Sequence, residues 1–97
     1  MIEKFNHVRS KAIRNAASGE ACTICDIEDD TTVFAHFDES FAGKGMGQKA
    51  DDLGGFFACY SCHVSYSRNK IAHWMILRAY YRTIRRLWDR GIIGGLK

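Results

Sequence analysis

Four cysteines, arranged as two Cys-x-x-Cys pairs, are the residues of this chain best suited to chemistry. Cys22 and Cys25 form the first pair, Cys59 and Cys62 form the second, and the sequence contains no other cysteine. Each short turn can direct two sulfurs at one ion, and four sulfur ligands leave a tetrahedral zinc ion with no open coordination position. The pattern therefore predicts a structural Zn²⁺ site.

The second pair is followed directly by His63, so it also matches the Cys-x-x-Cys-His pattern of covalent haem attachment. That interpretation leaves the first cysteine pair without a role, and it requires an export signal. Residues 1–6 lack the apolar core of a signal peptide. We therefore expect no haem, and we expect a cytoplasmic protein whose reduced thiols bind metal.

The chain has 97 residues, which is enough for a single domain. A domain of this size buries too little surface to be stable without help, so a metal that cross-links it is expected. The longest apolar run, residues 71–81, is interrupted by His73 and Arg78 and is far too short to cross a bilayer. No membrane contact is expected.

Charge is unevenly distributed, although the net charge is only +3. Residues 1–18 carry +3, residues 19–67 carry −7 and residues 68–97 carry +7. Carboxylates attract cations, while Lys and Arg neutralise phosphates, so an acidic centre with basic ends suits a metal site beside DNA. A simpler explanation is that two solvated helices are basic.

The spacing of apolar residues predicts an α+β domain in three parts. Residues 3–17 have helical spacing and are followed by Ser18 and Gly19, which predicts an N-terminal helix. Residues 31–37 are rich in β-branched and aromatic residues and predict a strand, and residues 54–58 predict a second extended segment. Between them, the glycine-rich residues 43–47 predict a loop.

From about residue 61 or 65 up to Gly91, which would end the helix, there is no proline or glycine, which predicts one long basic C-terminal helix. Its expected buried stripe consists of Ile71, Trp74, Leu77, Tyr81, Ile84 and Trp88. Another face would carry a basic ridge of Arg78, Arg82, Arg85 and Arg86. Further apolar residues widen the apolar face, so a homodimer or partner contact through this helix is expected; these are Met75, Ile76, Tyr80 and Leu87.

A second group of chemical interest consists of His36, Asp51, Asp52 and His63. His36 ends the first predicted strand, the two aspartates precede the second, and His63 opens the helix. Folding around one zinc ion would bring them close together. This arrangement resembles the HNH, or ββα-metal, nuclease superfamily, in which the motif surrounds a treble-clef zinc fold. It is most similar to the small YbcO-like nucleases of lambdoid phages and prophages, formerly called DUF1364, over roughly residues 10–67.

The resemblance implies specific roles. His36 would be the general base that activates water, and His63 would bind a catalytic divalent metal, Mg²⁺ or Mn²⁺. Asp51 or Asp52 would stand where the family usually has asparagine and would orient His36, or would itself bind the metal. Many HNH enzymes have an acid or a second histidine where this chain has Ala35, so the metal's carboxylate must come from Asp38, Asp51 or Asp52. The alternative is that His36 is a structural core histidine and that His63 only supports the zinc site.

Several basic residues are expected to contact a DNA backbone. They are Lys44 and Lys49 in the glycine-rich loop, Arg68 and Lys70 at the start of the long helix, and Arg78 and Arg82 on its ridge. The sequence thus predicts a single domain over residues 1–97, with an N-terminal helix (1–18), an HNH-like core (19–67) and a C-terminal helix (68–97). It is expected to be a DNA endonuclease; the alternative is a zinc-stabilised module that binds nucleic acid or protein without cutting.

Overall fold

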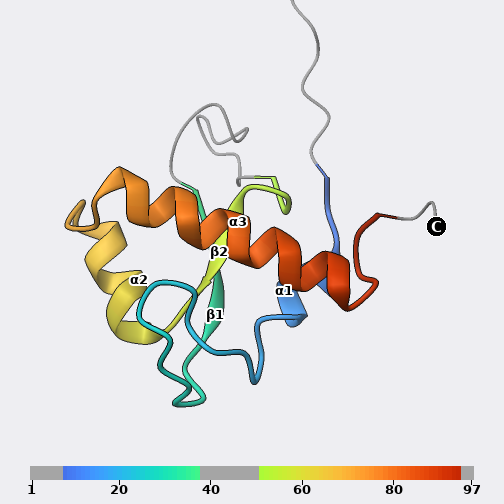
Figure 1. The fold of residues 1–97 in the computed structure, drawn as a ribbon, viewed down its shortest axis with the longest axis horizontal. Helices are drawn as coiled ribbons and strands as arrows, with labels where there is room; N and C mark the ends of the chain where they lie inside the picture. Colours follow the sequence, from blue (N-terminus) through green and yellow to red (C-terminus); the bar gives the residue numbers. More distant parts are fainter. Residues whose placement is uncertain (1–7, 38–50, 95–97) are drawn as a thin grey trace, which may run out of the picture.

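The computed structural model describes residues 8–37 and 51–94, which fold into a two-stranded sheet surrounded by three helices (Figure 1). This confirms the predicted α+β class. The elements follow in the order α1 (Lys11–Asn15), β1 (Val33–His36), β2 (Gly55–Ala58), α2 (Tyr60–Ser67) and α3 (His73–Asp89).

The two strands are antiparallel, with Phe34 opposite Phe57 and Ala35 opposite Phe56. Successive side chains on a strand point to opposite faces, so the Phe34–Phe57 pair and the Phe56 side chain lie on different faces of the sheet. Figure 1 shows α1 and α2 on opposite sides of the strands. The sheet therefore separates two small cores, one under each of these helices.

The core on the first face joins α1 to the sheet, where Ile13 packs with Phe34 and Phe57 and with Leu87 of α3. On the opposite face the ring of Phe56 meets Tyr66 of α2 edge to face, with 5.2 Å between the ring centroids. Neither core is large, which agrees with the need for a metal cross-link in a chain of this size.

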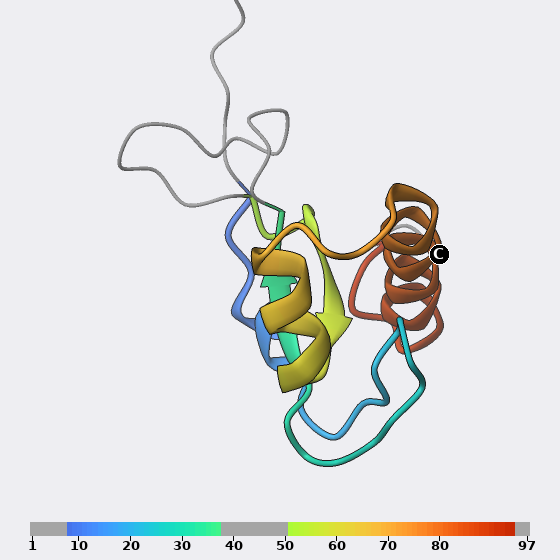
Figure 2. The ribbon, with the colours of Figure 1, turned by 90° about the vertical axis from the view of Figure 1, so that its left-hand side faces the viewer.

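Helix α3 covers the free edge of β2, on the side away from β1 (Figure 2). The backbone N–H of Phe57 donates to Oγ1 of Thr83 at 3.0 Å, and the Thr83 hydroxyl donates to the carbonyl of Ala79 at 2.9 Å. The Phe57 carbonyl accepts from both the backbone N–H and the hydroxyl of Thr23, at 2.9 and 2.7 Å. These contacts pair an edge that would otherwise be open to other strands.

Helix α1 is shorter than the predicted helix over residues 3–17, because within the described residues it begins at Lys11 and ends at Asn15. Ser10 is extended, with φ −140°, and its hydroxyl accepts the N–H of Ile13 at 3.2 Å, so it caps the helix and residues 8–10 lie before it. Residues 1–7 lie outside the described residues. Gly19 has φ +81°, in agreement with the predicted stop.

The predicted single long helix is wrong, because the chain turns between α2 and α3. Asn69 adopts φ +59°, its N–H donates to the carbonyl of Tyr66, and the N–H of Lys70 donates to the carbonyl of Ser65, both at 2.9 Å. This pair of bonds is the Schellman arrangement that ends helices, and asparagine is one of the few residues besides glycine that tolerate the left-handed conformation. The absence of proline and glycine therefore did not guarantee an unbroken helix.

The predicted buried stripe of α3 is also wrong. Ala79, Thr83 and Leu87 are the residues of α3 that are buried, with Met75, Ile76 and Tyr80 packed partly against the core. The small side chains of Ala79 and Thr83 allow the helix to lie close to the β2 edge, whereas the larger aromatic residues would hold it away. Four members of the expected stripe are instead exposed: Trp74 (63%), Leu77 (70%), Tyr81 (63%) and Trp88 (49%).

Gly55, opposite His36 in the sheet, has no room for a side chain. A Cβ at this position would lie 2.5 Å from the carbonyl oxygen of Ala35 and 2.6 Å from the ring of Phe34. We expect Gly55→Ala to lower the free energy of unfolding by about 1–3 kcal/mol, the usual cost of overpacking. Urea denaturation measures this, and Gly19→Ala, where the added Cβ contacts nothing but the φ is positive, separates steric from backbone effects. An unchanged midpoint for Gly55→Ala would contradict the packing described.

Within residues 8–37 and 51–94, no helix is both long and apolar enough to span a membrane.

Candidate metal centre and active site

The four cysteines form a compact group. Their sulfur atoms all lie within 4.8 Å of one another, and the sulfurs of Cys25 and Cys59 are 3.7 Å apart. A tetrahedral zinc ion with Zn–S bonds of about 2.3 Å holds its sulfur ligands about 3.8 Å apart. The predicted cysteine cluster is therefore confirmed as a group that could hold a metal such as zinc.

The protonation of these thiols also favours a bound cation. Burial acts to raise the pKa of Cys22, but hydrogen bonds from the backbone at Cys25, Cys59 and Ile24 outweigh it and lower that pKa to about 7. Burial, followed by the neighbouring sulfurs, raises the pKa of Cys62 well above its usual range, and burial also raises the pKa of Cys25. Without a cation, Cys22 therefore ionises much more readily than Cys25 and Cys62. A bound divalent cation removes this difference because it stabilises all four thiolates together.

The first cysteine pair is positioned by a tight turn. The N–H of Cys22 donates to the carbonyl of Ile27 at 2.8 Å, and the N–H of Asp26 donates to the carbonyl of Cys22 at 3.0 Å. Asp26 follows the second cysteine with φ +66°, which reverses the chain just after the ligands. Cys59 precedes α2 and Cys62 lies in its first turn, so the second pair is held by the start of a helix.

An arginine ladder on α3 holds the segment that leads into this turn. We use that name for four arginines at four-residue steps, three on α3 and Arg90 just after its end, whose guanidinium groups donate to backbone carbonyls between residues 16 and 24. Arg78 donates to Ile24 (3.2 Å), Arg82 to Thr23 (3.2 Å), Arg86 to Ala21 (2.6 Å) and Arg90 to Ala16 (2.7 Å). Ion pairs of Arg82 with Asp26, and of Arg86 and Arg90 with Glu20, add to these contacts.

The predicted proximity of His36 to an aspartate is found in the structure. His36 Nε2 lies 2.7 Å from Oδ1 of Asp52. Asp52 is buried (1% exposed), whereas 32% of the His36 side chain is exposed. His36 shares its sheet face with Phe34, and the two ring centroids are 5.0 Å apart, so the pair lies on the α1 side of the sheet.

Several donors converge on the Asp52 carboxylate. Oδ2 accepts the backbone N–H of Ser10 at 2.7 Å and lies 3.3 Å from Nε of Arg14, while Oδ1 lies 3.8 Å from a terminal nitrogen of Arg9. Burial acts to raise the pKa of Asp52, but the hydrogen bonds from His36 and Ser10 and the charge of Arg14 outweigh it, so the pKa lies below its usual value. The group is therefore ionised at neutral pH.

Asp51 has a different role from its neighbour. Its carboxylate accepts the backbone N–H groups of Val8, at 3.1 Å, and of Leu53, at 2.7 Å. The N–H of Asp52 donates to the carbonyl of Val8 at 2.9 Å. The two aspartates thus attach the segment before α1 to the entry of β2, and Asp51 acts on backbone rather than on His36.

The lowered pKa of Asp52 makes stability depend on pH. A depressed carboxyl pKa stabilises the fold above the ordinary value near 3.8, and this contribution is lost as the pH falls through the lower pKa of the folded state. We expect the difference in unfolding free energy between wild type and Asp52→Asn to shrink as the pH falls from 7 to 3. Urea denaturation at each pH measures it, with the exposed Asp89→Asn as control. A difference that stays constant with pH would contradict the role of the Asp52 charge.

His63 lies on a different element and a different side of the sheet. Its helix, α2, packs on the face of Phe56 through Tyr66, whereas His36 belongs to the face of Phe34. In the described ranges, the four cysteines form a group of metal-binding type, and neither His36 nor His63 belongs to a second one. The described residues therefore give no support for a catalytic metal shared by His63 and an aspartate, and that metal site stays a prediction.

The predicted DNA-contacting residues fall into three sets. Lys44 and Lys49, together with the candidate metal ligand Asp38, lie outside the described residues. Arg68 and Lys70 are exposed in the turn between α2 and α3. Arg78 and Arg82 belong to the arginine ladder, so their guanidinium groups have partners within the chain.

Sequence reasoning did not find Arg9 and Arg14 as members of the histidine site. Nothing in their spacing indicates it, because their link to Asp52 spans about forty residues of sequence and depends on how α1 packs on the sheet. The charge pattern showed only that the N-terminal segment is basic.

Comparison with known protein families gives one match. Residues 11–91 match the family described as Putative nuclease YbcO, and this range includes all four cysteines, His36 and Asp52. Neither the curated proteins nor the solved structures gave a match.

Proposed function

The chain belongs to the family described as Putative nuclease YbcO, and on this premise we propose that it hydrolyses phosphodiester bonds in DNA, with His36 as the general base. The observation that carries the proposal is the hydrogen bond of 2.7 Å between His36 Nε2 and the buried carboxylate of Asp52. A half-buried histidine fixed by an ionised aspartate is the arrangement that a general base requires.

The hydrogen bond determines which nitrogen can act. An ionised carboxylate only accepts hydrogen bonds, so Nε2 of His36 carries a proton and donates it to Asp52. Nδ1 then keeps its lone pair and can accept a proton from water as that water attacks phosphorus. Asp52 is in this view a positioning residue, since it sets the tautomer and stabilises the imidazolium that forms.

Arg14 supplies positive charge beside this base. Its guanidinium lies 3.3 Å from Asp52, and its side chain is 46% exposed. Because Arg presents five donors, it can hold the aspartate and still bind a phosphate oxygen. We include Arg14 in the proposed site as a contact to the scissile phosphate.

The finer family assignment is part of the proposal. The order of cysteine turn, two-stranded hairpin and helix carrying the second cysteine pair supports a treble-clef, HNH-like core of phage or prophage type. DNA contacts would come from Arg68 and Lys70, and from Lys44 and Lys49. Mg²⁺ or Mn²⁺ is proposed as the catalytic ion, but the described candidate ligands do not fit a site for it, so no step is assigned to that ion.

One observation favours a second candidate function, a zinc-stabilised binding module without catalysis. One oxygen of Asp51 and one oxygen of Asp52 accept backbone N–H groups of residues 8–10, which gives both aspartates a structural reason to be present. In that case His36 would pack against Phe34 and Asp52 as a structural residue.

Cleavage of supercoiled plasmid distinguishes the two functions. The purified zinc-loaded protein is incubated with plasmid alone and with Mg²⁺ or Mn²⁺, and nicked and linear products are quantified. We expect cleavage that requires the added ion and that falls steeply with salt. An intact plasmid under all these conditions, together with retained DNA binding, would favour the module.

A further inference from the structure

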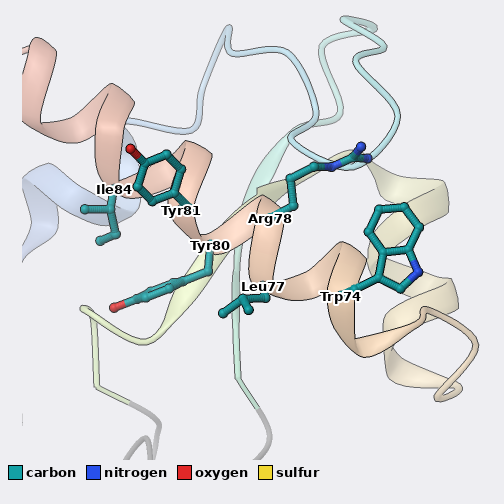
Figure 3. Close-up of a pocket in the computed structure, with 6 residues that line it drawn as sticks. All are labelled: Trp74, Leu77, Arg78, Tyr80, Tyr81 and Ile84. Atoms are coloured by element: carbon teal, nitrogen blue, oxygen red, sulfur yellow. The ribbon is translucent and has the colours of Figure 1, made fainter.

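The exposed side of α3 carries a continuous apolar surface, which we call the α3 seam. It consists of four exposed residues, Trp74, Leu77, Tyr81 and Trp88, and of Ile84, which is partly buried against the core beneath α1. Figure 3 shows all of these except Trp88 along the helix, around an open hollow of about 630 Å³ that Arg78 and Tyr80 also line. Three large aromatic residues exposed on one helix face are uncommon on a protein that has no partner.

The spacing of the seam fits a second helix. Its members follow one another at steps of three, four, three and four residues, which is the spacing of the two core positions in a coiled coil. The core of the domain itself uses the other side of α3, at Ala79, Thr83 and Leu87. Helix α3 also forms one side of the molecule in Figure 2, and four of the five seam residues are exposed, so another helix can reach the seam. We propose that two copies of this chain associate through their α3 seams.

The charges around the seam favour a second copy over nucleic acid. None of the five seam residues is charged. Arg78 donates to the carbonyl of Ile24 and lies over the ring of Trp74, at 5.2 Å from its centroid, while Arg85 pairs with Asp89 at 3.8 Å. The positive charges nearest the seam therefore already have partners within the chain. A DNA strand or an acidic peptide would find an apolar surface with little unpaired positive charge.

The seam is also complementary to itself. The seam alternates between two core positions: Trp74, Tyr81 and Trp88 occupy the first, and Leu77 and Ile84 occupy the second. When two seams run antiparallel, the first core position of one helix faces the second core position of the other. Trp74 then faces Ile84 of the other copy, and Leu77 faces Tyr81, so that each of these layers pairs a large ring with a smaller aliphatic side chain, while Trp88 lies beyond the paired layers at the end of the interface. Such alternation of large and small residues packs well, whereas a parallel pairing would place ring against ring.

The surface available is close to the area that a small stable interface buries. Trp74, Tyr81 and Trp88 expose about half to two thirds of their surface, and an aromatic side chain carries about 150–250 Å². Together with Leu77 and the flanking residues, two seams approach the roughly 1,200 Å² at the lower limit of stable interfaces. The expected association is therefore a homodimer of moderate affinity.

Light scattering after size exclusion and sedimentation equilibrium test the proposal, and neither depends on nuclease activity. We expect wild-type zinc-loaded protein to show about 22 kDa, twice the chain mass of 11.0 kDa. Tyr81→Glu and Leu77→Glu should give monomers, with the dimer dissociation constant raised about 100-fold or more. Tyr60→Glu is the matched control, because Tyr60 is as exposed as Leu77 (both 70%) but lies on α2; it should remain dimeric.

A mixing experiment tests that the two seams meet each other. Leu77→Glu and Tyr81→Lys should each be monomeric, and their equimolar mixture should dimerise again because the glutamate introduced at position 77 of one copy then faces the lysine introduced at position 81 of the other. Circular dichroism shows that each variant is folded. A wild-type monomer at millimolar concentration, or a dimer unaffected by both glutamate variants, would overturn the proposal. A monomeric wild type whose single-stranded DNA binding is lost in Tyr81→Glu would assign the seam to stacking of bases instead.

Discussion

Replacing Cys59 with alanine, or removing zinc with a chelator, is expected to unfold the domain cooperatively. The cysteine cluster joins two turns separated by 33 residues of sequence, and the two cores on either side of the sheet are small. Binding of a structural zinc ion contributes about 10–16 kcal/mol in small zinc domains, which equals or exceeds the whole stability of a typical domain, about 5–15 kcal/mol.

Circular dichroism at 222 nm during titration with chelator measures this loss, and readdition of Zn²⁺ should restore the signal. Elemental analysis should find one zinc per wild-type chain and none in Cys59→Ala. Ser61→Ala, an exposed position between the two ligands of the second pair, serves as the control and should keep both metal and melting temperature. Retention of the helical signal and of the melting temperature after complete chelation would show that the cluster does not stabilise the fold.

His36→Ala is expected to reduce the rate of plasmid cleavage by about 10²–10⁴-fold, the usual effect of removing a general base. The melting temperature should change little, because 32% of the His36 side chain is exposed and the Ser10 and Arg14 contacts of Asp52 remain. Asp52→Asn should cause a smaller loss, since its amide oxygen can still accept the Nε2 proton of His36 and hold the same tautomer.

His73→Ala is the matched control for this experiment, because His73 is an exposed histidine in the first turn of α3, outside the site. Its cleavage rate should equal that of wild type. The melting temperature of His36→Ala, measured beside its cleavage rate, separates catalysis from structure, since a lost rate with an unchanged melting temperature cannot come from unfolding. Equal rates for wild type and His36→Ala would exclude His36 as the base, even if the protein is a nuclease.

The sequence alone predicted the features that depend on residues close together in the chain. Cys-x-x-Cys spacing brings two sulfurs to one point without help from the rest of the fold, so the cysteine cluster could be predicted. The first strand was predictable for a similar reason, because the β-branched and aromatic residues at 31–37 favour an extended, partly buried chain. The proximity of His36 to Asp52 followed from strand order, since both lie at the same end of the hairpin.

Other features depend on contacts between segments that are far apart in sequence, and only the tertiary structure decided them. Periodicity identified the most apolar face of α3 as the buried one, but the β2 edge accepts the face whose side chains are small, Ala79 and Thr83. The sequence indicated that the basic ridge could bind phosphate, but three of its arginines, Arg78, Arg82 and Arg86, donate to backbone carbonyls of residues 21–24. Likewise, Arg14 reaches Asp52 only because Ile13 packs on Phe34. A pattern gives the chemical nature of a face, whereas shape and position determine which partner that face meets.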